Sequence, residues 1–199
     1  MFISIDGIDG AGKSTQLDRL HELLTERGHD VEFVRDPGST EVGEAIRGVL
    51  LDSDLEMHRR CETLMYMAAR SQLVEQRIRP ARASGRVVVS DRYLLANVVY
   101  QSVGDQIDAD TIWKLGAIAT GGIYPDLTIL LDLPAEVAHS RRHGEADRME
   151  RRGDDYMEAV RQAFLKELPN CGGESVVIDA TQGPEDVWHR IAQAVESIL

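Results

Sequence analysis

The stretch Gly7-Ile8-Asp9-Gly10-Ala11-Gly12-Lys13-Ser14 lies near the start of the chain and decides its fold. It matches the pattern G-x-x-x-x-G-K-[ST] of a phosphate-binding loop, in which backbone amides and the N-terminus of the following helix converge on phosphate oxygens. The lysine of this pattern reaches the β- and γ-phosphates, and the serine hydroxyl can ligate Mg²⁺. The stretch from Gly7 to Thr15 therefore predicts a binding site for a nucleoside triphosphate and Mg²⁺.

The residues on both sides of this loop have the pattern that the motif requires. Before it, Met1-Phe2-Ile3-Ser4-Ile5 is a short apolar run, as expected of a buried strand. After it, Leu17, Leu20 and Leu24 recur at helical spacing, and the helical pattern ends at Gly28. A chance match in a loop would lack these flanks, so we interpret the stretch as a functional phosphate site.

The rest of the chain alternates apolar runs with helical patterns. Four further strands are predicted at residues 31–34, 87–90, 127–133 and 176–179. Helices are predicted after residue 40, from about 55 to 82 with a break near Pro80, at 93–101 and 109–119, from Pro134 onward, and at 186–199. This alternation predicts an α/β fold with a five-stranded parallel sheet and helices on both faces. At 199 residues, the chain fits one domain, 1–199.

The composition excludes several classes of protein. With 34 acidic residues against 22 lysines and arginines, the formal net charge is −12, which disfavours a general surface for nucleic acid or for an anionic membrane. The apolar runs fall far short of a membrane span, and the N-terminus is a strand rather than a secretory segment, so we expect a soluble, cytoplasmic protein. Cys61 and Cys171 are far apart and lack metal-ligand spacing, so we expect two reduced thiols.

Residues that directly follow the predicted strands are the first candidates for chemistry, because ligands of a parallel sheet collect beyond the carboxyl ends of its strands. These positions hold the phosphate loop, Arg35-Asp36-Pro37-Gly38, Asp91-Arg92-Tyr93 and Asp179-Ala180-Thr181-Gln182. Asp91 follows a β-branched run, the position from which a carboxylate holds Mg²⁺ beside Ser14. Capping the next helix is the alternative role for Asp91.

Arginines are distributed as expected for a second phosphate site. Arg35, Arg47, Arg70 and Arg92 lie at the ends of separate predicted elements and can converge there. Between residues 141 and 152, five arginines stand against three acidic residues, a net charge of +2. We interpret 141–153 as a short Arg-rich lid, with a solvated, salt-bridged helix face as the alternative. Two polyanions need cations and Mg²⁺ to react, so the pattern favours phosphoryl transfer to a phosphate acceptor.

In several blocks the sequence resembles the thymidylate kinases, a nucleoside monophosphate kinase family, along nearly the whole chain. The phosphate loop is similar, including its acidic residue at Asp9. Residues 35–40 resemble the family's Arg-Glu-Pro-Gly-Gly-Thr, and residues 91–101 resemble Asp-Arg-Tyr-x-x-Ser-x-x-x-Tyr-Gln. Further similar blocks are residues 43–47, 124–132, 147–150 and 179–182. The chain departs from the family pattern at Asp36, Ser39 and Ala96, where Glu, Gly and Ser are usual.

The resemblance implies a P-loop kinase fold, a homodimer, and Mg²⁺-dependent transfer of the γ-phosphoryl group of ATP to dTMP, giving ADP and dTDP for dTTP synthesis. The implied metal ligands are Ser14 and Asp91. The implied ATP-binding residues are Gly7, Ile8, Asp9, Gly10, Ala11, Gly12, Lys13, Ser14, Thr15, Arg141, Thr181 and Gln182. The implied dTMP-binding residues are Asp9, Pro37, Tyr66, Arg70, Arg92, Asn97, Tyr100 and Gln101.

The resemblance also implies roles for the acceptor residues. Asp9 would contact the sugar 3′-hydroxyl, and Arg70 and Arg92 would grip the acceptor phosphate. Tyr66 would stack on the thymine, while Tyr100 would crowd the 2′ position and so disfavour ribonucleotides. Core packing is the alternative for the two tyrosines, and ion pairs are the alternative for the two arginines.

The implied catalytic residues are Lys13, Arg92, Arg148 and Asp9. The phosphate loop carries Gly10-Ala11 rather than an arginine before Gly12, so the cation on the migrating phosphoryl group is expected from the lid, at Arg148. Arg141 would lie against the adenine.

Two other functions stay open at this point. One is a kinase for another pyrimidine monophosphate or for a deoxynucleoside. The other is a nucleotide-dependent switch or ATPase module, because a phosphate loop alone shows only that a nucleoside triphosphate binds.

Overall fold

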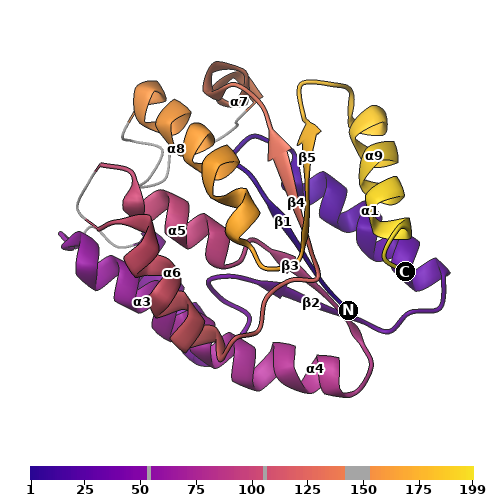
Figure 1. Ribbon diagram of the computed structural model, residues 1–199, viewed down its shortest axis with the longest axis horizontal. Coiled ribbons are helices and arrows are strands. Elements are labelled where there is room, and N and C mark those ends of the chain that lie inside the picture. The colour runs from indigo at the N-terminus through magenta and orange to yellow at the C-terminus, as the bar shows by residue number, and fades with distance from the viewer. Residues whose placement is uncertain (53–54, 105–106, 142–152) are drawn as a thin grey trace.

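The computed structural model describes residues 1–52, 55–104, 107–141 and 153–199. Its centre is a five-stranded sheet in the order β2-β3-β1-β4-β5 (Figure 1). All neighbouring strands are parallel, as predicted. The strands are β1 (Phe2–Asp6), β2 (Val31–Arg35), β3 (Val87–Asp91), β4 (Leu127–Asp132) and β5 (Glu174–Asp179).

The helices cover both faces of this sheet. Helices α1 and α9 lie side by side on one face, and α3, α4, α5, α6 and α8 lie on the other side of the sheet in Figure 1. Their bounds are α1 (Lys13–Glu26), α2 (Glu41–Arg47), α3 (Arg59–Leu73), α4 (Arg79–Ala83), α5 (Leu94–Ser102), α6 (Ala109–Thr120), α7 (Ala135–Arg141), α8 (Asp154–Glu167) and α9 (Pro184–Glu196). The predicted arrangement of helices on both faces is confirmed.

Strand β1 is the central strand, and every one of its residues is buried. Ile3 and Ile5 belong to one apolar cluster with Leu20 of α1, whereas Phe2 belongs to a second cluster with Val88 of β3. A strand that is buried on both faces is almost uniformly apolar, which explains the run that begins this chain. Because β1 is packed from both sides, the loop that follows it starts from a rigid point.

The strand order places the phosphate loop at a topological switch point. The chain passes from β1 to β2 and β3 on one side of β1, and then returns to β4 and β5 on its other side. At such a point the connections leave the sheet in opposite directions and open a crevice beyond the carboxyl ends of the strands. Residues that follow β1, β2 and β3 therefore face one another.

Two predictions about helices need correction. The helix expected from residue 55 begins at Arg59, and the expected break near Pro80 is a π-helical turn at Val74–Ile78 that leads directly into α4. Proline lacks an N–H and its ring crowds the carbonyl four residues earlier, and the wider π turn directly before it accommodates both effects. Helix α8 was not predicted, although Met157, Val160 and Phe164 are buried at helical spacing.

Neither cysteine is paired: Cys61 is exposed and Cys171 is buried. Burial raises the pKa of Cys171 to about 12, so that thiol stays protonated. Within the described residues, no helix is both long and apolar enough to cross a membrane.

Candidate active site

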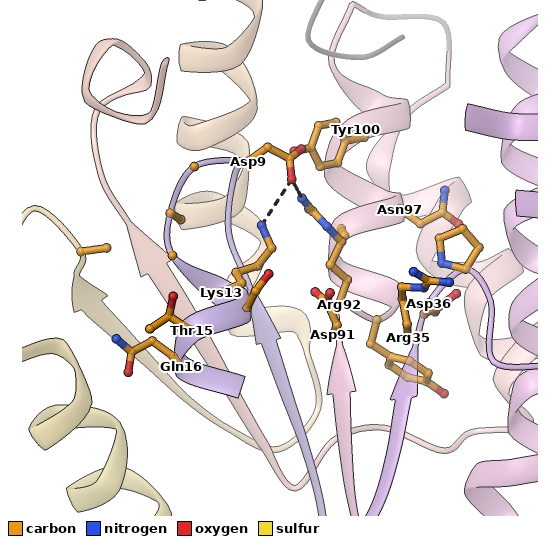
Figure 2. Close-up of a pocket in the computed structure, with 18 of the residues that line it drawn as sticks. Asp9, Lys13, Thr15, Gln16, Arg35, Asp36, Asp91, Arg92, Asn97 and Tyr100 are labelled. Carbon is orange, nitrogen blue, oxygen red and sulfur yellow. Dashed lines mark hydrogen bonds and ion pairs between the residues drawn. The ribbon is translucent and has the colours of Figure 1, made fainter. Parts of the chain in front are cut away.

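A cleft of about 780 Å³ opens beyond the carboxyl ends of β1, β2 and β3. Lys13, Thr15 and Gln16 lie on one side of it, Arg35, Asp36 and Asn97 lie on the other, and Asp9 and Arg92 lie between them (Figure 2). The cleft thus has two parts that meet at Asp9 and Arg92.

The phosphate loop holds its lysine in place with backbone carbonyls. The Nζ atom of Lys13 donates to the carbonyl oxygens of Gly7 and Ile8, both at 3.0 Å. Gly10 and Gly12 adopt φ values of 90° and 88°, which residues with a side chain rarely adopt. At Gly10, a Cβ would lie 2.3 Å from the carbonyl oxygen of Ala138 in α7, so the loop packs directly on the backbone of that helix.

One carboxylate oxygen joins the two parts of the cleft. The Oδ1 atom of Asp9 accepts a hydrogen bond from Arg92 at 2.7 Å and lies 3.5 Å from Nζ of Lys13. Burial alone would raise the pKa of Asp9, but the two adjacent cations outweigh burial and hold it well below its usual range. Asp9 is therefore ionised at neutral pH and keeps both cations aimed at the same space.

Arg92 is held in an unusual backbone conformation, with φ of 65°. Its amide donates to the carbonyl of Ile5 in β1 at 3.0 Å, and its guanidinium lies over the ring of Tyr100. A left-handed conformation costs a residue with a side chain about 1–2 kcal/mol. Such strain persists only where the surrounding structure imposes it, and it clusters at functional sites. Here it accompanies a side chain that contacts the phosphate loop.

The far wall of the cleft is built from buried polar side chains. Arg70 is almost fully buried; its Nε donates to Asp36 at 2.5 Å, and its Nη1 donates to Oδ1 of Asn97 at 2.9 Å. Its guanidinium also lies over the ring of Tyr93. Tyr66, on the same helix as Arg70, lines this wall and is half-buried. The wall is therefore preorganised before any ligand binds.

The opposite end of the cleft is closed by the turn after β5. Arg141, the last residue of α7, donates to the carbonyl oxygens of Ala180 at 2.7 Å and of Thr181 at 3.2 Å. Gln16 of α1 donates to the carbonyl of Pro184 at the start of α9, at 3.0 Å. These bonds tie the turn after β5 to α7 and to α1, the helix that follows the phosphate loop, and so fix the position of the turn relative to that loop.

The residues predicted to hold Mg²⁺ fit that ion. Ser14 and Asp91 both line the cleft, and Oδ1 of Asp91 is buried without a hydrogen-bond partner among the described residues. Asp91 does not cap the next helix, because Tyr93 occupies the N-cap position of α5. No group of three or more His, Cys, Asp or Glu side chains suited to a metal occurs in the described part of the chain. One carboxylate and one hydroxyl suit Mg²⁺, which takes its other ligands from phosphates and water.

Most of the predicted site residues meet in this cleft. The cleft is lined by the predicted residues Asp9, Gly10, Ala11, Gly12, Lys13, Ser14, Thr15, Pro37, Tyr66, Arg70, Asp91, Arg92, Asn97, Tyr100, Gln101, Arg141 and Gln182. Gly7, Ile8 and Thr181 do not line it, and they contribute through backbone carbonyls instead. Arg148 and the predicted lid from 142 to 152 lie outside the described residues, so the role of Arg148 stays a prediction.

Some lining residues were absent from the predicted set. Arg47 had been noted only among the arginines that can converge; it lines the cleft and donates to the carbonyl of Pro37 at 3.0 Å. Asp36 was named within the block after the second strand but was given no role, yet it is the buried partner of Arg70. Pro184 and Val187 line the cleft at the end that is closed by the turn after β5. Nothing in their local pattern distinguishes them, because they reach the cleft only through the packing of α9 on α1.

The parallel sheet, the phosphate loop after β1 and the cation-lined cleft define a P-loop nucleoside monophosphate kinase, a phosphotransferase. The profile of the thymidylate kinase family matches residues 5–191, and the chain belongs to that family. A thymidylate kinase from Rhodopirellula baltica is 58% identical over 190 residues, which cover 96% of this chain and 78% of the relative. One from Desulforudis audaxviator is 45% identical over 198 residues, covering 96% and 90%.

Replacing Gly10 with alanine tests the contact between the phosphate loop and α7. The new Cβ would meet the Ala138 carbonyl at 2.3 Å, so the loop or α7 must move, and we expect the KM for ATP to rise about tenfold or more. Gly85→Ala is the matched control: its φ is 79°, but nothing lies within 4 Å of the new Cβ. It should lose about 1–2 kcal/mol of stability and keep its KM. Equal KM values for the two variants would contradict this account.

Asp6, the last residue of β1, gives a pH-dependent prediction. Burial raises its pKa to about 6, and Ser4 donates to its Oδ2 at 3.2 Å. In the folded protein, Asp6 thus keeps its proton up to about pH 6, whereas the unfolded chain releases it near pH 4. This group therefore lowers the free energy of unfolding as the pH rises from about 4 to about 6. Asparagine does not titrate, so the free energy of unfolding of Asp6→Asn relative to wild type should increase by about 2 kcal/mol from pH 4.5 to pH 7, as measured by urea unfolding. A difference that does not change with pH would contradict the prediction.

Proposed function

We propose that this protein transfers the γ-phosphoryl group of ATP to dTMP, with Mg²⁺, and yields ADP and dTDP for dTTP synthesis. The observation that carries the proposal is the single carboxylate of Asp9, which contacts both Lys13 and Arg92. A donor phosphate held by Lys13 and an acceptor phosphate held by Arg92 would meet at this point. Holding two reactants in contact removes much of the entropic barrier to their reaction.

The protein's own residues supply binding and charge rather than a strong base. Lys13 and the loop amides would hold the donor phosphates, and Arg92 and Arg70 would hold the acceptor. An acceptor phosphate oxygen is already negative, so the main obstacle is repulsion between two polyanions, which cations offset. Mg²⁺, held by Ser14 and Asp91, would neutralise charge on the donor phosphates. We propose that Arg148, from the segment 141–153, acts as the lid cation on the migrating group.

The remaining assignments follow the two parts of the cleft. Arg141, fixed by two backbone carbonyls, would lie flat against the adenine, with Gln182 beside it. Tyr66 would stack on the thymine, and Tyr100 would crowd the sugar 2′ position. Asp9 would also meet the 3′-hydroxyl. We further propose that the enzyme works in the cytoplasm.

A panel of acceptors tests the reaction. In a coupled assay of ADP release with dTMP, dUMP, dCMP and UMP, dTMP should give the highest kcat/KM. Faster turnover of another monophosphate would favour the alternative kinase, and equal ADP release without any acceptor would favour an ATPase module.

Arg92→Met should lower kcat/KM for dTMP by about 10²–10³-fold, because it removes a charge at the acceptor phosphate. Arg19→Met, at an exposed ion pair with Glu185, is the matched control and should not change it.

We also propose a homodimer formed by α3 and α6, which pack against each other. Leu64 on α3 is 54% exposed and Ile118 on α6 is 80% exposed, and a second copy would cover them. Sedimentation equilibrium should give a dimer mass for the wild type and a monomer mass for Ile118→Asp. Val177→Asp, on the edge strand β5, should remain a dimer. A monomeric wild type would contradict the proposal.

A further inference from the structure

A line of buried polar side chains leads from the cleft into α3. Arg70 donates to Oδ1 of Asn97 at 2.9 Å, Nδ2 of Asn97 donates to Oε1 of Gln101 at 2.6 Å, and Nε2 of Gln101 donates to Oε1 of Glu62 at 2.8 Å. These four side chains are at most 3% exposed. Arg70, Asn97 and Gln101 line the cleft, whereas Glu62 lies behind them.

The two ends of this line determine how its amides are oriented. A guanidinium can only donate hydrogen bonds, and a carboxylate can only accept them. Turning either amide around would set N–H against N–H or oxygen against oxygen. Arg70 therefore orients Asn97 from one end, and Glu62 orients Gln101 from the other. Each amide uses one of its two N–H bonds within the line, so the direction of its second N–H is fixed by the same contacts.

We propose that Glu62 is a positioning residue for the acceptor base. By accepting one N–H of Gln101, it fixes the direction of the second N–H of that amide, and an N–H held toward the base suits a carbonyl oxygen at C4 better than an amino group there. The inference rests on the proposed function, because it assigns Gln101 to the acceptor base. It adds a residue that touches no substrate yet contributes to the choice of substrate.

The surroundings of Glu62 fit this role. The Nη1 atom of Arg59 lies 3.9 Å from Oε1 of Glu62. The same guanidinium donates to the carbonyl oxygens of Tyr100 at 2.8 Å and Val103 at 3.2 Å. The counter-cation of Glu62 is thus anchored at the carboxyl end of α5, the helix that carries Gln101. Glu62 is thus linked to α5 through Arg59 as well as through Gln101. Without the carboxylate, Nε2 of Gln101 would lose its buried acceptor, and a buried donor left without a partner costs free energy.

The test compares Glu62→Met, which removes the acceptor, with Glu62→Gln, which keeps an acceptor oxygen. Glu62→Met should raise the KM for dTMP about tenfold, leave the KM for ATP unchanged, and lower the ratio of kcat/KM for dTMP over dCMP about fivefold. Glu62→Gln should stay within about threefold of wild type. KM does not depend on the fraction of folded enzyme, so the measurement remains valid if Glu62→Met is less stable. Glu75→Met, an exposed glutamate near the far end of the same helical run, is the matched control and should behave as wild type.

A double variant separates positioning from a general structural role. If Glu62 acts through Gln101, adding Glu62→Met to Gln101→Met should raise the KM for dTMP no further. Additive effects, an equal rise in the KM for ATP, or a Glu62→Met enzyme with wild-type KM would each overturn the inference. A wild-type enzyme that prefers another acceptor would instead contradict the proposed function, so the two failures are distinguishable.

Discussion

The site depends on the ionised carboxylate of Asp9, which holds Lys13 and Arg92 toward the same space. Without it, these two cations would repel each other across the mouth of the phosphate loop. With it, they are arranged before any nucleotide arrives, and little reorganisation is needed when phosphates replace water. Preorganised charge of this kind is usually the largest contribution to catalysis of phosphoryl transfer.

The sheet makes this arrangement possible. Asp9 follows β1 and Arg92 follows β3, and these two strands are neighbours in register, with Ile5 opposite Asp91. The amide of Arg92 donates to the carbonyl of Ile5, so the strained residue is tied to the strand that carries the loop. The left-handed conformation of Arg92 can persist because packing of the neighbouring strands contributes more free energy than the backbone strain costs.

Sequence patterns predicted those parts of the molecule that depend on local chemistry. The five strands and the phosphate loop followed from apolar runs and from glycine spacing, and the resemblance supplied most of the cleft's lining. The residues that were missed reach the site through tertiary packing. Val187 lines the cleft because α9 packs on α1, and Asp36 matters because Arg70, 34 positions later, reaches its carboxylate. No local pattern encodes such pairings.

The two walls of the cleft use polar groups for different purposes. Beside the phosphate loop, Lys13 and Arg92 share the carboxylate of Asp9, so this wall presents two cations together to phosphates. Along the far wall beyond Arg70, the charge of Glu62 is matched by Arg59, so what remains around Asn97 and Gln101 is directional hydrogen bonding. An uncharged base gains little from net charge but much from correctly oriented donors. The distribution of counter-ions in the fold thus separates the part of the cleft suited to phosphates from the part suited to a base.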